Sequence, residues 1–389
     1  MNVNFEFLGS EPIENVITCM NYQLDKVIYF GYHETIEKYK ACTEKYLKEY
    51  CGVQKVVFHP LSHEDLHSVL NSMRKEIEYE KGQKNRIYFD ITGGEDLLLV
   101  AFGMLAHEYR LPMHMYDVKK NKMIELDNGR HDPMDEDVPR RETRLDLHKM
   151  IAMVGGTINT KRQKNMKSAG AAENAEDIES LWKISTKYAD CWNSFSEFLH
   201  SQFSPDEHLR AYRKAIYVLE ALYSSSSSLN DITKLRHMLE DLADADIIRE
   251  LICNEDFIEF RFKNETLKEI LWDAGSILEL HVYQEEKQLS DDCGAGVHLD
   301  WDGVVRYPYE TDVQNEIDVL SVRGNIPTFI SCKSGRLSAA QTLHALYELQ
   351  TVAERFGGSY AQKVLVVRND IGVTYTERAR EMGITVRKI

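Results

Sequence analysis

The sequence has no pair of cysteines at Cys-x-x-Cys spacing, no long apolar run and no basic segment at its start. Its seven cysteines are scattered between Cys19 and Cys332, which argues against a zinc site or a disulfide framework and predicts reduced, mostly buried thiols. The apolar runs fall short of the roughly 18 residues that cross a bilayer, and MNVNFEFLGS lacks the regions of a signal peptide. We therefore expect a cytoplasmic protein with no membrane partner.

Basic residues are also scarce, with 47 Lys and Arg against 63 Asp and Glu and a formal net charge of -16. This balance opposes long-range attraction to nucleic acid, so any nucleic-acid function must rest on local basic patches. His107, His114, His131 and His148 lack the spacing of metal ligands. At 389 residues, with 43% apolar residues, the chain is long enough for two domains and a smaller third.

The first 127 residues alternate between strand-like and helix-like segments. The strand-like segments are rich in branched and aromatic residues and read NVNFEFL, KVIYFGY, VQKVVFHP and RIYFDI. Each is followed by helical apolar spacing, which predicts a parallel α/β sheet in a first domain at residues 1–150. The segment MHMYDVKKNKMIEL, from Met113, predicts a closing antiparallel hairpin that turns at Lys120 and Asn121.

The middle of the chain has a different pattern. Residues 151–177 predict a linker, because the stretch from 161 to 177 has no apolar period. Residues 178–268 are mainly helical in pattern, including YRKAIYVLEALY, and end in two alternating runs around Asn254. They predict either a winged helix or a plain structural connector, and no basic recognition helix stands out. Residues 269–389 alternate again, which predicts a second α/β domain.

A short hairpin in this last domain, NEIDVLSVRGNIPTFISCKSG, carries two carboxylates and a lysine. A two-residue turn at Gly324 and Asn325 predicts a register that pairs Asp318 with Ser331 and Glu316 with Lys333. Directly opposed residues share one face of a sheet, so these four side chains would lie on one surface. The buried face would carry Ile317, Val319, Ile330 and Cys332. The polar surface is then either a solvated face with a Glu316–Lys333 ion pair or a catalytic site.

Phosphodiester hydrolysis gives a chemical reason for the catalytic interpretation. The reaction needs oxygen ligands that fix a hard divalent cation beside the phosphate, and an ammonium group that orients water or offsets developing charge. Asp318 on one strand and Lys333 on the next supply both. Glu279, in the amphipathic segment GSILELHVYQEEK, offers a further carboxylate, although simple exposure on a helix would also explain it.

A helix glutamate, then Asp318, then a strand ending in Ser-Cys-Lys resembles the PD-(D/E)xK nuclease superfamily. The segments NEIDV, from Asn315, and ISCK, from Ile330, are similar to those of the cyclic-oligoadenylate-activated nucleases of type III CRISPR systems. The resemblance covers nearly the whole chain. It implies an α/β protein with an N-terminal Rossmann-like CARF (CRISPR-associated Rossmann fold) domain, a helical or winged-helix-like connector and a C-terminal restriction-endonuclease-like domain.

The resemblance also implies a catalytic site and a divalent metal cofactor, Mn²⁺ or Mg²⁺. The catalytic residues would be Glu279, Glu316, Asp318, Ser331 and Lys333, and the metal ligands Glu279, Asp318 and Cys332. The chain departs from the superfamily at Ser331, where a second acidic residue is usual. A ligand could be replaced there by Glu316, by the Cys332 carbonyl or by water on the serine hydroxyl. We therefore expect one well-bound ion rather than a rigid two-metal site.

Two loops of the first domain form a second candidate site. In RIYFDITGGEDLLLVAFG a strand ends at Thr92-Gly93-Gly94 and a helix begins, so free amides would face an anionic ligand, or Thr92 would simply cap the helix. The stretch from Leu8 to Pro12 ends the first strand in the same way, and both loops would open at the carboxyl edge of the sheet. The CARF resemblance implies that a cyclic oligoadenylate binds these loops. The residues carried over are Ser10, Glu11, Thr92, Gly93 and Gly94.

One feature of these loops departs from related sequences. Glu95 and Asp96 follow the glycines where relatives often have a threonine and a lysine, and their charges do not suit phosphate. We therefore expect contacts from backbone amides rather than from side chains.

The sequence as a whole predicts a homodimeric, metal-dependent nuclease of antiviral CRISPR defence. It would cleave DNA, RNA or both when cyclic tetra-adenylate occupies the paired N-terminal domains. The alternative is a cyclic-oligoadenylate-responsive DNA-binding transcriptional regulator, with a working winged helix and a C-terminal domain that has lost catalysis at Ser331.

Overall fold

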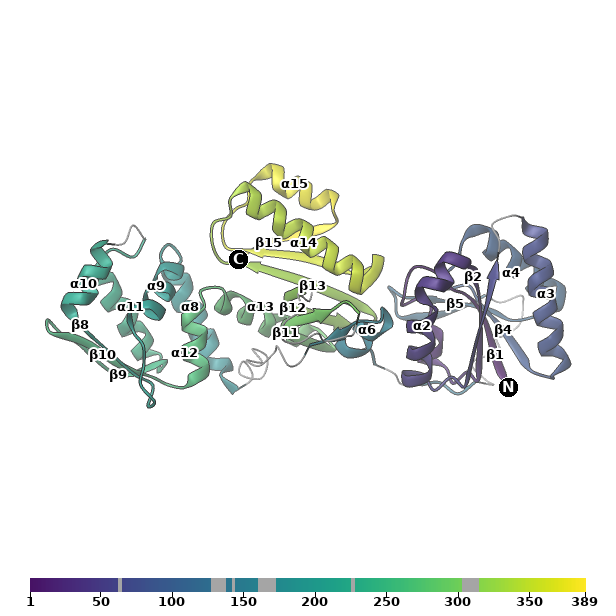
Figure 1. The fold of residues 1–389 in the computed structure, drawn as a ribbon, viewed down its shortest axis with the longest axis horizontal. Coiled ribbons are helices and arrows are strands. Elements are labelled where there is room, and N and C mark those ends of the chain that lie inside the picture. Colours follow the sequence, from purple (N-terminus) through teal and green to yellow (C-terminus); the bar gives the residue numbers. More distant parts are fainter. Residues whose placement is uncertain (62–64, 127–137, 142–143, 160–172, 225–227, 303–314) are drawn as a thin grey trace.

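The chain folds around three separate β-sheets, which lie in a row along the molecule (Figure 1). The computed structural model describes residues 1–61, 65–126, 138–141, 144–159, 173–224, 228–302 and 315–389. No described helix is both long and apolar enough to cross a membrane. The α/β fold class predicted from the sequence is confirmed.

The N-terminal domain is a six-stranded sheet in the order β3-β2-β1-β4-β5-β6. Its strands are β1 (Asn2–Phe7), β2 (Lys26–Tyr32), β3 (Lys55–Leu61), β4 (Arg86–Asp90), β5 (Met113–Asp117) and β6 (Lys122–Leu126). The first five are parallel, and β6 returns antiparallel to β5 in the hairpin that the sequence predicts. The sheet is Rossmann-like in its strand order.

Helices cover both faces of this sheet. They are α1 (Ile17–Asn21), α2 (His33–Tyr50), α3 (Leu66–Gly82) and α4 (Asp96–Tyr109). Helices α3 and α4 pack together on one face, and α2 lies on the other (Figure 1). Because β1 pairs with both β2 and β4, the chain changes direction between β1 and β4, which is where a ligand crevice is expected at the carboxyl ends of the strands.

The C-terminal sheet also has six strands, in the order β15-β14-β13-β12-β11-β7. They are β7 (Thr157–Ile158), β11 (Asp292–Asp300), β12 (Asn315–Arg323), β13 (Ile326–Lys333), β14 (Gln362–Val367) and β15 (Ile384–Lys388). One face carries α13 (Ser276–Leu289), and the opposite side carries α14 (Ala339–Gly357) and α15 (Val373–Glu381) (Figure 1). Helix α6 (Leu147–Met153) packs against α2, α14, β11 and β12, so it touches both α/β domains.

The central domain is mostly helical, with a three-stranded antiparallel sheet in the order β8-β10-β9. Its elements are α8 (Ala175–Lys187), α9 (Trp192–Gln202), β8 (Arg210–Lys214), α10 (Ala215–Ser224), α11 (Ile232–Asp244), β9 (Ile248–Cys253), β10 (Phe257–Phe262) and α12 (Glu265–Trp272). From α9 to β10, the order helix, strand, two helices and two strands is that of a winged helix. The structure therefore favours this interpretation over a connector without a fold of its own.

Three segments differ from the sequence expectations. The stretch 151–177 is not irregular throughout, because α6 runs to Met153 and β7 pairs with β11, while residues 160–172 lie outside the described residues. Strand β8 occupies the start of a segment predicted to be helical, and α10 begins only at Ala215. Strand β11 was not predicted, because Gly294 and Gly296 weaken its strand pattern. For β7, β8 and β11, pairing with a neighbouring strand fixes a conformation that the local sequence does not determine.

Candidate active site and ligand loops

The β12–β13 hairpin places the candidate catalytic residues at the open end of two strands. The ladder runs from Arg323–Ile326 at the turn to Val319–Ile330, which confirms the predicted register over these pairs. Gly324 has φ +60°, a conformation that glycine adopts easily at the first position of such a turn. Asp318 comes just before Val319 in the chain and is one residue beyond this last pair, on the side away from the turn. Its side chain therefore lies where the two strands part.

Asp318 is held by the strand opposite. Its Oδ2 accepts hydrogen bonds from the backbone N–H of Cys332 at 2.5 Å and from the Ser331 hydroxyl at 3.2 Å. The ammonium of Lys333 lies 3.6 Å from the same oxygen, and 32% of the lysine side chain is exposed against 17% for the aspartate. The carboxylate is thus fixed in place, while the ammonium beside it remains accessible to a substrate.

Glu279 belongs to helix α13, which packs against β11, β12 and β13. It lies in the first turn of the helix, and its Oε1 is 3.3 Å from where a side chain on Gly275 would begin. Burial raises the pKa of the Cys332 thiol well above its usual value, and the charges of Asp318 and Glu279 raise it further. Burial and the charges of both carboxylates therefore favour a protonated Cys332 thiol.

This donor set fits a hard divalent cation in part. Within the described ranges, no group of three or more His, Cys, Asp or Glu side chains is arranged to hold a metal ion. Asp318, Glu279 and the Cys332 carbonyl offer only oxygen, and Mg²⁺ commonly binds through one or two carboxylates and keeps several waters. The protonated, buried Cys332 sulfur does not suit such an ion, so the carbonyl is the better candidate from this residue.

Glu316 lies outside this arrangement. Its Oε1 is 4.0 Å from Nε2 of His298 on β11, and 48% of its side chain is exposed. Lys333 pairs with Asp318 instead, so the simple Glu316–Lys333 ion pair considered from the sequence is wrong. The structure thus separates the two carboxylates of the hairpin into one that is held beside the lysine and one at the margin.

We expect Ser331→Ala to reduce cleavage by no more than about threefold. The hydroxyl donates one 3.2 Å hydrogen bond to Asp318, which the shorter bond from the Cys332 amide would still hold. Steady-state cleavage rates at several metal concentrations would test this. A loss of about a hundredfold or more would show instead that the hydroxyl contacts metal, water or substrate directly.

The Thr92 side chain organises the first ligand loop from inside. Asp90 Oδ1 accepts hydrogen bonds from both the backbone N–H and the hydroxyl of Thr92, and Thr92 Oγ1 accepts one from the Tyr116 N–H. His114 Nε2 lies 3.4 Å from Asp90 Oδ2 in the buried interior. Burial opposes ionisation of Asp90, but His114 and these hydrogen bonds hold its pKa below the usual value. The N-cap residue of α4 is Glu95, so the alternative prediction that Thr92 caps this helix is wrong.

The two glycines leave the crevice open. A side chain on Gly93 would begin 2.7 Å from Oε2 of Glu14, and Gly94 has φ +140°, which L side chains rarely adopt. Helix α4 starts directly after them without a side-chain capping hydrogen bond. We therefore still expect its first amides to bind an anionic ligand at the carboxyl edge between β1 and β4.

The second predicted ligand loop, the stretch from Leu8 to Pro12, has residues in two different environments. Gly9 is fixed by a reciprocal pair of hydrogen bonds with the Asn15 side chain, and Ser10 after it is exposed beside the crevice. Glu11 points elsewhere, because its Oε2 accepts a hydrogen bond from the Ser359 N–H of the C-terminal domain at 2.9 Å. Ser10 can therefore meet a ligand, whereas the carboxylate of Glu11 lies at a domain interface.

Sequence reasoning missed the residues that join the domains near both sites. Tyr360 donates a hydrogen bond to Glu14, and Asn325 donates one to Asn121. Near Lys333, Asn193 of α9 approaches Ser334 at 3.4 Å. These partners are between 141 and 346 residues apart in the chain, and no local pattern marks such pairs.

The C-terminal part of the chain is similar to a known family of endonuclease domains. Residues 268–388 match the family model of the Card1-like endonuclease domain. The predicted resemblance to a CARF nuclease is confirmed. The matched residues include Asp318, Lys333 and Glu279, and the match supports nuclease activity in this part of the chain. A search of curated proteins returned no match.

Solved structures share the whole fold at low sequence identity. Protein VC1899 from Vibrio cholerae superimposes with a TM-score of 0.70 at 16% identity, over 100% of this chain and 94% of its own. Can2 from Sulfobacillus thermosulfidooxidans, solved in complex with cyclic tetra-adenylate, gives a TM-score of 0.62 at 12% identity, over 99% of this chain and 93% of its own. These similarities extend the common fold beyond the Card1-like endonuclease domain to all three domains.

Proposed function

We propose that this protein is a metal-dependent nuclease that cleaves DNA, RNA or both when cyclic tetra-adenylate occupies its N-terminal domain. The observation that carries the proposal is the Lys333 ammonium 3.6 Å from Asp318, at the open end of two strands in the Card1-like endonuclease domain. The fold shared with Can2, which binds cyclic tetra-adenylate, supports this activator. A role in antiviral CRISPR defence follows from the same resemblance.

The chemistry assigns a task to each side chain. Asp318 and Glu279, with the Cys332 carbonyl, would hold a Mn²⁺ or Mg²⁺ ion, which polarises the phosphate and lowers the pKa of its bound water. Asp318 is positioned for this by the Cys332 amide. Lys333 orients the attacking water or offsets the charge that develops on the phosphate oxygens. Ser331 supports Asp318 through its hydroxyl, and Glu316, which is exposed and paired with His298, has no assigned task in this site.

A homodimer would place two copies of the ligand loops face to face. A cyclic ligand with repeating nucleotides suits a twofold site, because each copy can make the same contacts. Helix α4, which follows the Thr92–Gly94 loop, exposes two apolar side chains one turn apart, Val100 at 52% and Met104 at 46%. If the protein pairs through α4, these two side chains would lie at the interface.

The alternative function, a ligand-responsive DNA-binding regulator, draws support from the winged-helix element order of the central domain. The helix that would enter the groove, α11, is a poor match for that task. Its Lys234 pairs with Asp190 at 2.6 Å, and the helix also carries Glu240, Asp241 and Asp244. The nuclease is therefore the better supported of the two.

Incubation with labelled single-stranded DNA, double-stranded DNA and RNA tests the proposal. We expect cleavage only when Mn²⁺ or Mg²⁺ and cyclic tetra-adenylate are both present, and none after chelation. Binding of DNA without cleavage under every condition would favour the regulator instead.

Two carboxylate variants test the metal site within the same assay. Asp318→Ala should abolish cleavage at every Mn²⁺ concentration, because it removes the ligand that β13 holds in place. Glu279→Ala should lose activity at low metal and regain part of it in excess Mn²⁺, because water can replace a ligand at the edge of the site. Glu348→Ala, on the exposed surface of α14, is the matched control. Full activity of either Asp318→Ala or Glu279→Ala would contradict the assignment.

A further inference from the structure

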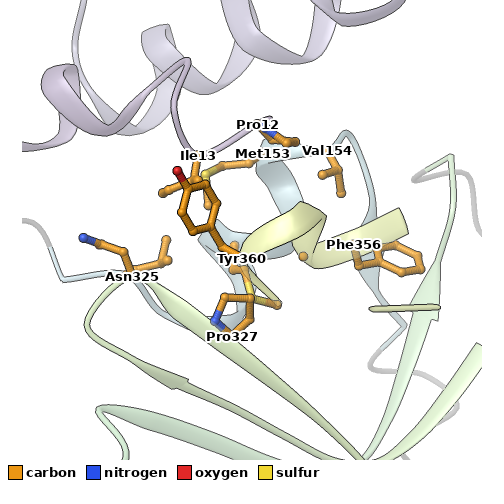
Figure 2. A pocket seen from close by; sticks show the side chains of 11 residues that line it. Pro12, Ile13, Met153, Val154, Asn325, Pro327, Phe356 and Tyr360 are labelled. Atoms are coloured by element: carbon orange, nitrogen blue, oxygen red, sulfur yellow. The ribbon is translucent and has the colours of Figure 1, made fainter. Parts of the chain in front are cut away.

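The loop after β1 touches the C-terminal domain at the short turn between α14 and β14. Glu11 accepts a hydrogen bond from the Ser359 N–H, and the Tyr360 hydroxyl donates one to Glu14 Oε1 at 2.6 Å. Figure 2 shows the Tyr360 ring rising beside Ile13, with Pro12 close by. A small pocket at this junction is lined mainly by apolar side chains. Two carboxylates of the N-terminal domain therefore contact one turn of the C-terminal domain.

Glu14 belongs to this interface and to the ligand crevice at once. One of its oxygens, Oε1, accepts the hydrogen bond from Tyr360. The other, Oε2, lies 2.7 Å from where a side chain on Gly93 would begin. Burial raises the pKa of Glu14, and the hydrogen bond from Tyr360 lowers it in part. The charges of Glu11 and Asp90 raise it further. An anion bound against the Gly93 loop would add another negative charge beside this carboxylate.

A second line of hydrogen bonds runs from the same loop to the catalytic hairpin. Thr92 Oγ1 accepts from the Tyr116 N–H, and the Tyr116 hydroxyl donates to Asn121 Oδ1 at 2.6 Å. The same Asn121 oxygen accepts a hydrogen bond from the Asn325 side chain. Asn325 is in the turn between the strands that carry Asp318 and Lys333. The loop is thus joined to the turn end of the hairpin, and the residues around this turn and around Tyr360 line one pocket.

We propose that the hydrogen bond from Tyr360 to Glu14 is an autoinhibitory contact, which stabilises the resting arrangement and which an anionic activator on the Gly93 loop breaks by repelling Glu14. Tyr360 lies two residues before the start of β14, and β14 pairs with β13 from Thr328 to Lys333. A shift of the turn that carries Tyr360 would therefore act on the strand that presents the catalytic lysine. This inference rests on the proposed function, because it takes the phosphates of the cyclic oligoadenylate as the anion.

Thermodynamic linkage makes the proposal quantitative. A contact that exists only in the resting arrangement opposes both cleavage and activator binding, since each requires the other arrangement. Removal of the contact should shift the equilibrium between the resting and active arrangements toward the active one. Cleavage without activator and affinity for the activator should therefore both rise. A contact with a purely structural role would lower stability without raising either.

Tyr360→Phe deletes the hydroxyl and keeps the ring. We expect cleavage without activator to rise by roughly 10- to 150-fold, the factor that corresponds to a hydrogen bond to a charged group, and the affinity for cyclic tetra-adenylate to rise by a similar factor. Cleavage without activator, calorimetric binding and thermal unfolding would be measured together. The matched control is Tyr347→Phe, which deletes an exposed hydroxyl from α14 that contacts Arg378.

Glu14→Gln separates the charge of Glu14 from its hydrogen bond. The amide oxygen can still accept from Tyr360, but it no longer repels an anion. We expect this variant to bind cyclic tetra-adenylate more tightly than wild type and to show a smaller ratio of stimulated to unstimulated cleavage.

The outcomes separate this inference from the function on which it rests. If wild-type protein neither binds cyclic tetra-adenylate nor responds to it, the proposed function and the inference both fail. If the wild type responds normally and Tyr360→Phe shows unchanged or reduced unstimulated cleavage, the inference alone is overturned. An increase in unstimulated cleavage without tighter binding would also overturn it, because linkage requires both.

Discussion

Lys333→Ala should abolish cleavage by the activated protein and leave its fold and its affinity for the activator unchanged. The ammonium is the only group of the candidate site, among the described residues, that brings a positive charge to within 3.6 Å of Asp318. Loss of one preorganised group that stabilises transition-state charge typically lowers turnover by about 100- to 1,000-fold. Single-turnover cleavage at saturating activator and metal would measure the loss.

The lysine is well suited to this test because its removal disturbs little else. About a third of the side chain is exposed, and its pairing with Asp318 is supplemented by the Cys332 amide, which the substitution leaves in place. Lys48→Ala, at an exposed pair with Glu44 on α2, controls for the general loss of a lysine. Turnover by Lys333→Ala within a few-fold of wild type would remove Lys333 from the mechanism.

Gly94→Arg should eliminate activation and leave the proposed dimer intact. The backbone at Gly94 has φ +140°, and a side chain there would begin 3.0 Å from Leu99 and 3.5 Å from Phe7. An arginine would therefore distort the loop and fill the crevice between β1 and β4. We expect no measurable binding of cyclic tetra-adenylate by calorimetry and no stimulation of cleavage, with the mass of a dimer by light scattering.

The matched control for this substitution is Gly82→Arg at the end of α3, where an added side chain would meet nothing within 4 Å. It introduces the same charge and bulk into the same domain and should leave activation intact. Unchanged activator binding by Gly94→Arg would show that the ligand binds elsewhere, and a monomer with tight one-to-one binding would refute the twofold site.

Parts of this structure follow from local rules, and the sequence predicts them well. The β12–β13 register is set by a glycine-containing turn and by alternation of period two, and both act over a few residues. The parallel N-terminal sheet follows from the alternation of strand-like and helix-like segments. The placement of the loops after β1 and β4 at one edge follows in turn, because parallel strands bring their carboxyl ends together.

Other parts depend on contacts that no local rule contains. The sequence cannot show that Lys333 pairs with Asp318 rather than with its cross-strand partner Glu316, because the strands part beyond Val319. It cannot show that the Thr92 hydroxyl turns inward to Asp90, or that Glu11 meets the backbone of Ser359. These outcomes depend on how side chains far apart in the chain meet after folding.

The pairing of β7 with β11 means that the catalytic domain is discontinuous in sequence. The chain contributes α6 and β7 to this domain, leaves it to build α8 through α12, and returns with α13. The central domain is thus an insertion with both ends tethered to the nuclease. A fragment that starts at residue 268 would lack the strand that covers the β11 edge and the helix that packs beside it. Such a fragment would expose an unpaired edge, which is a hazard for aggregation.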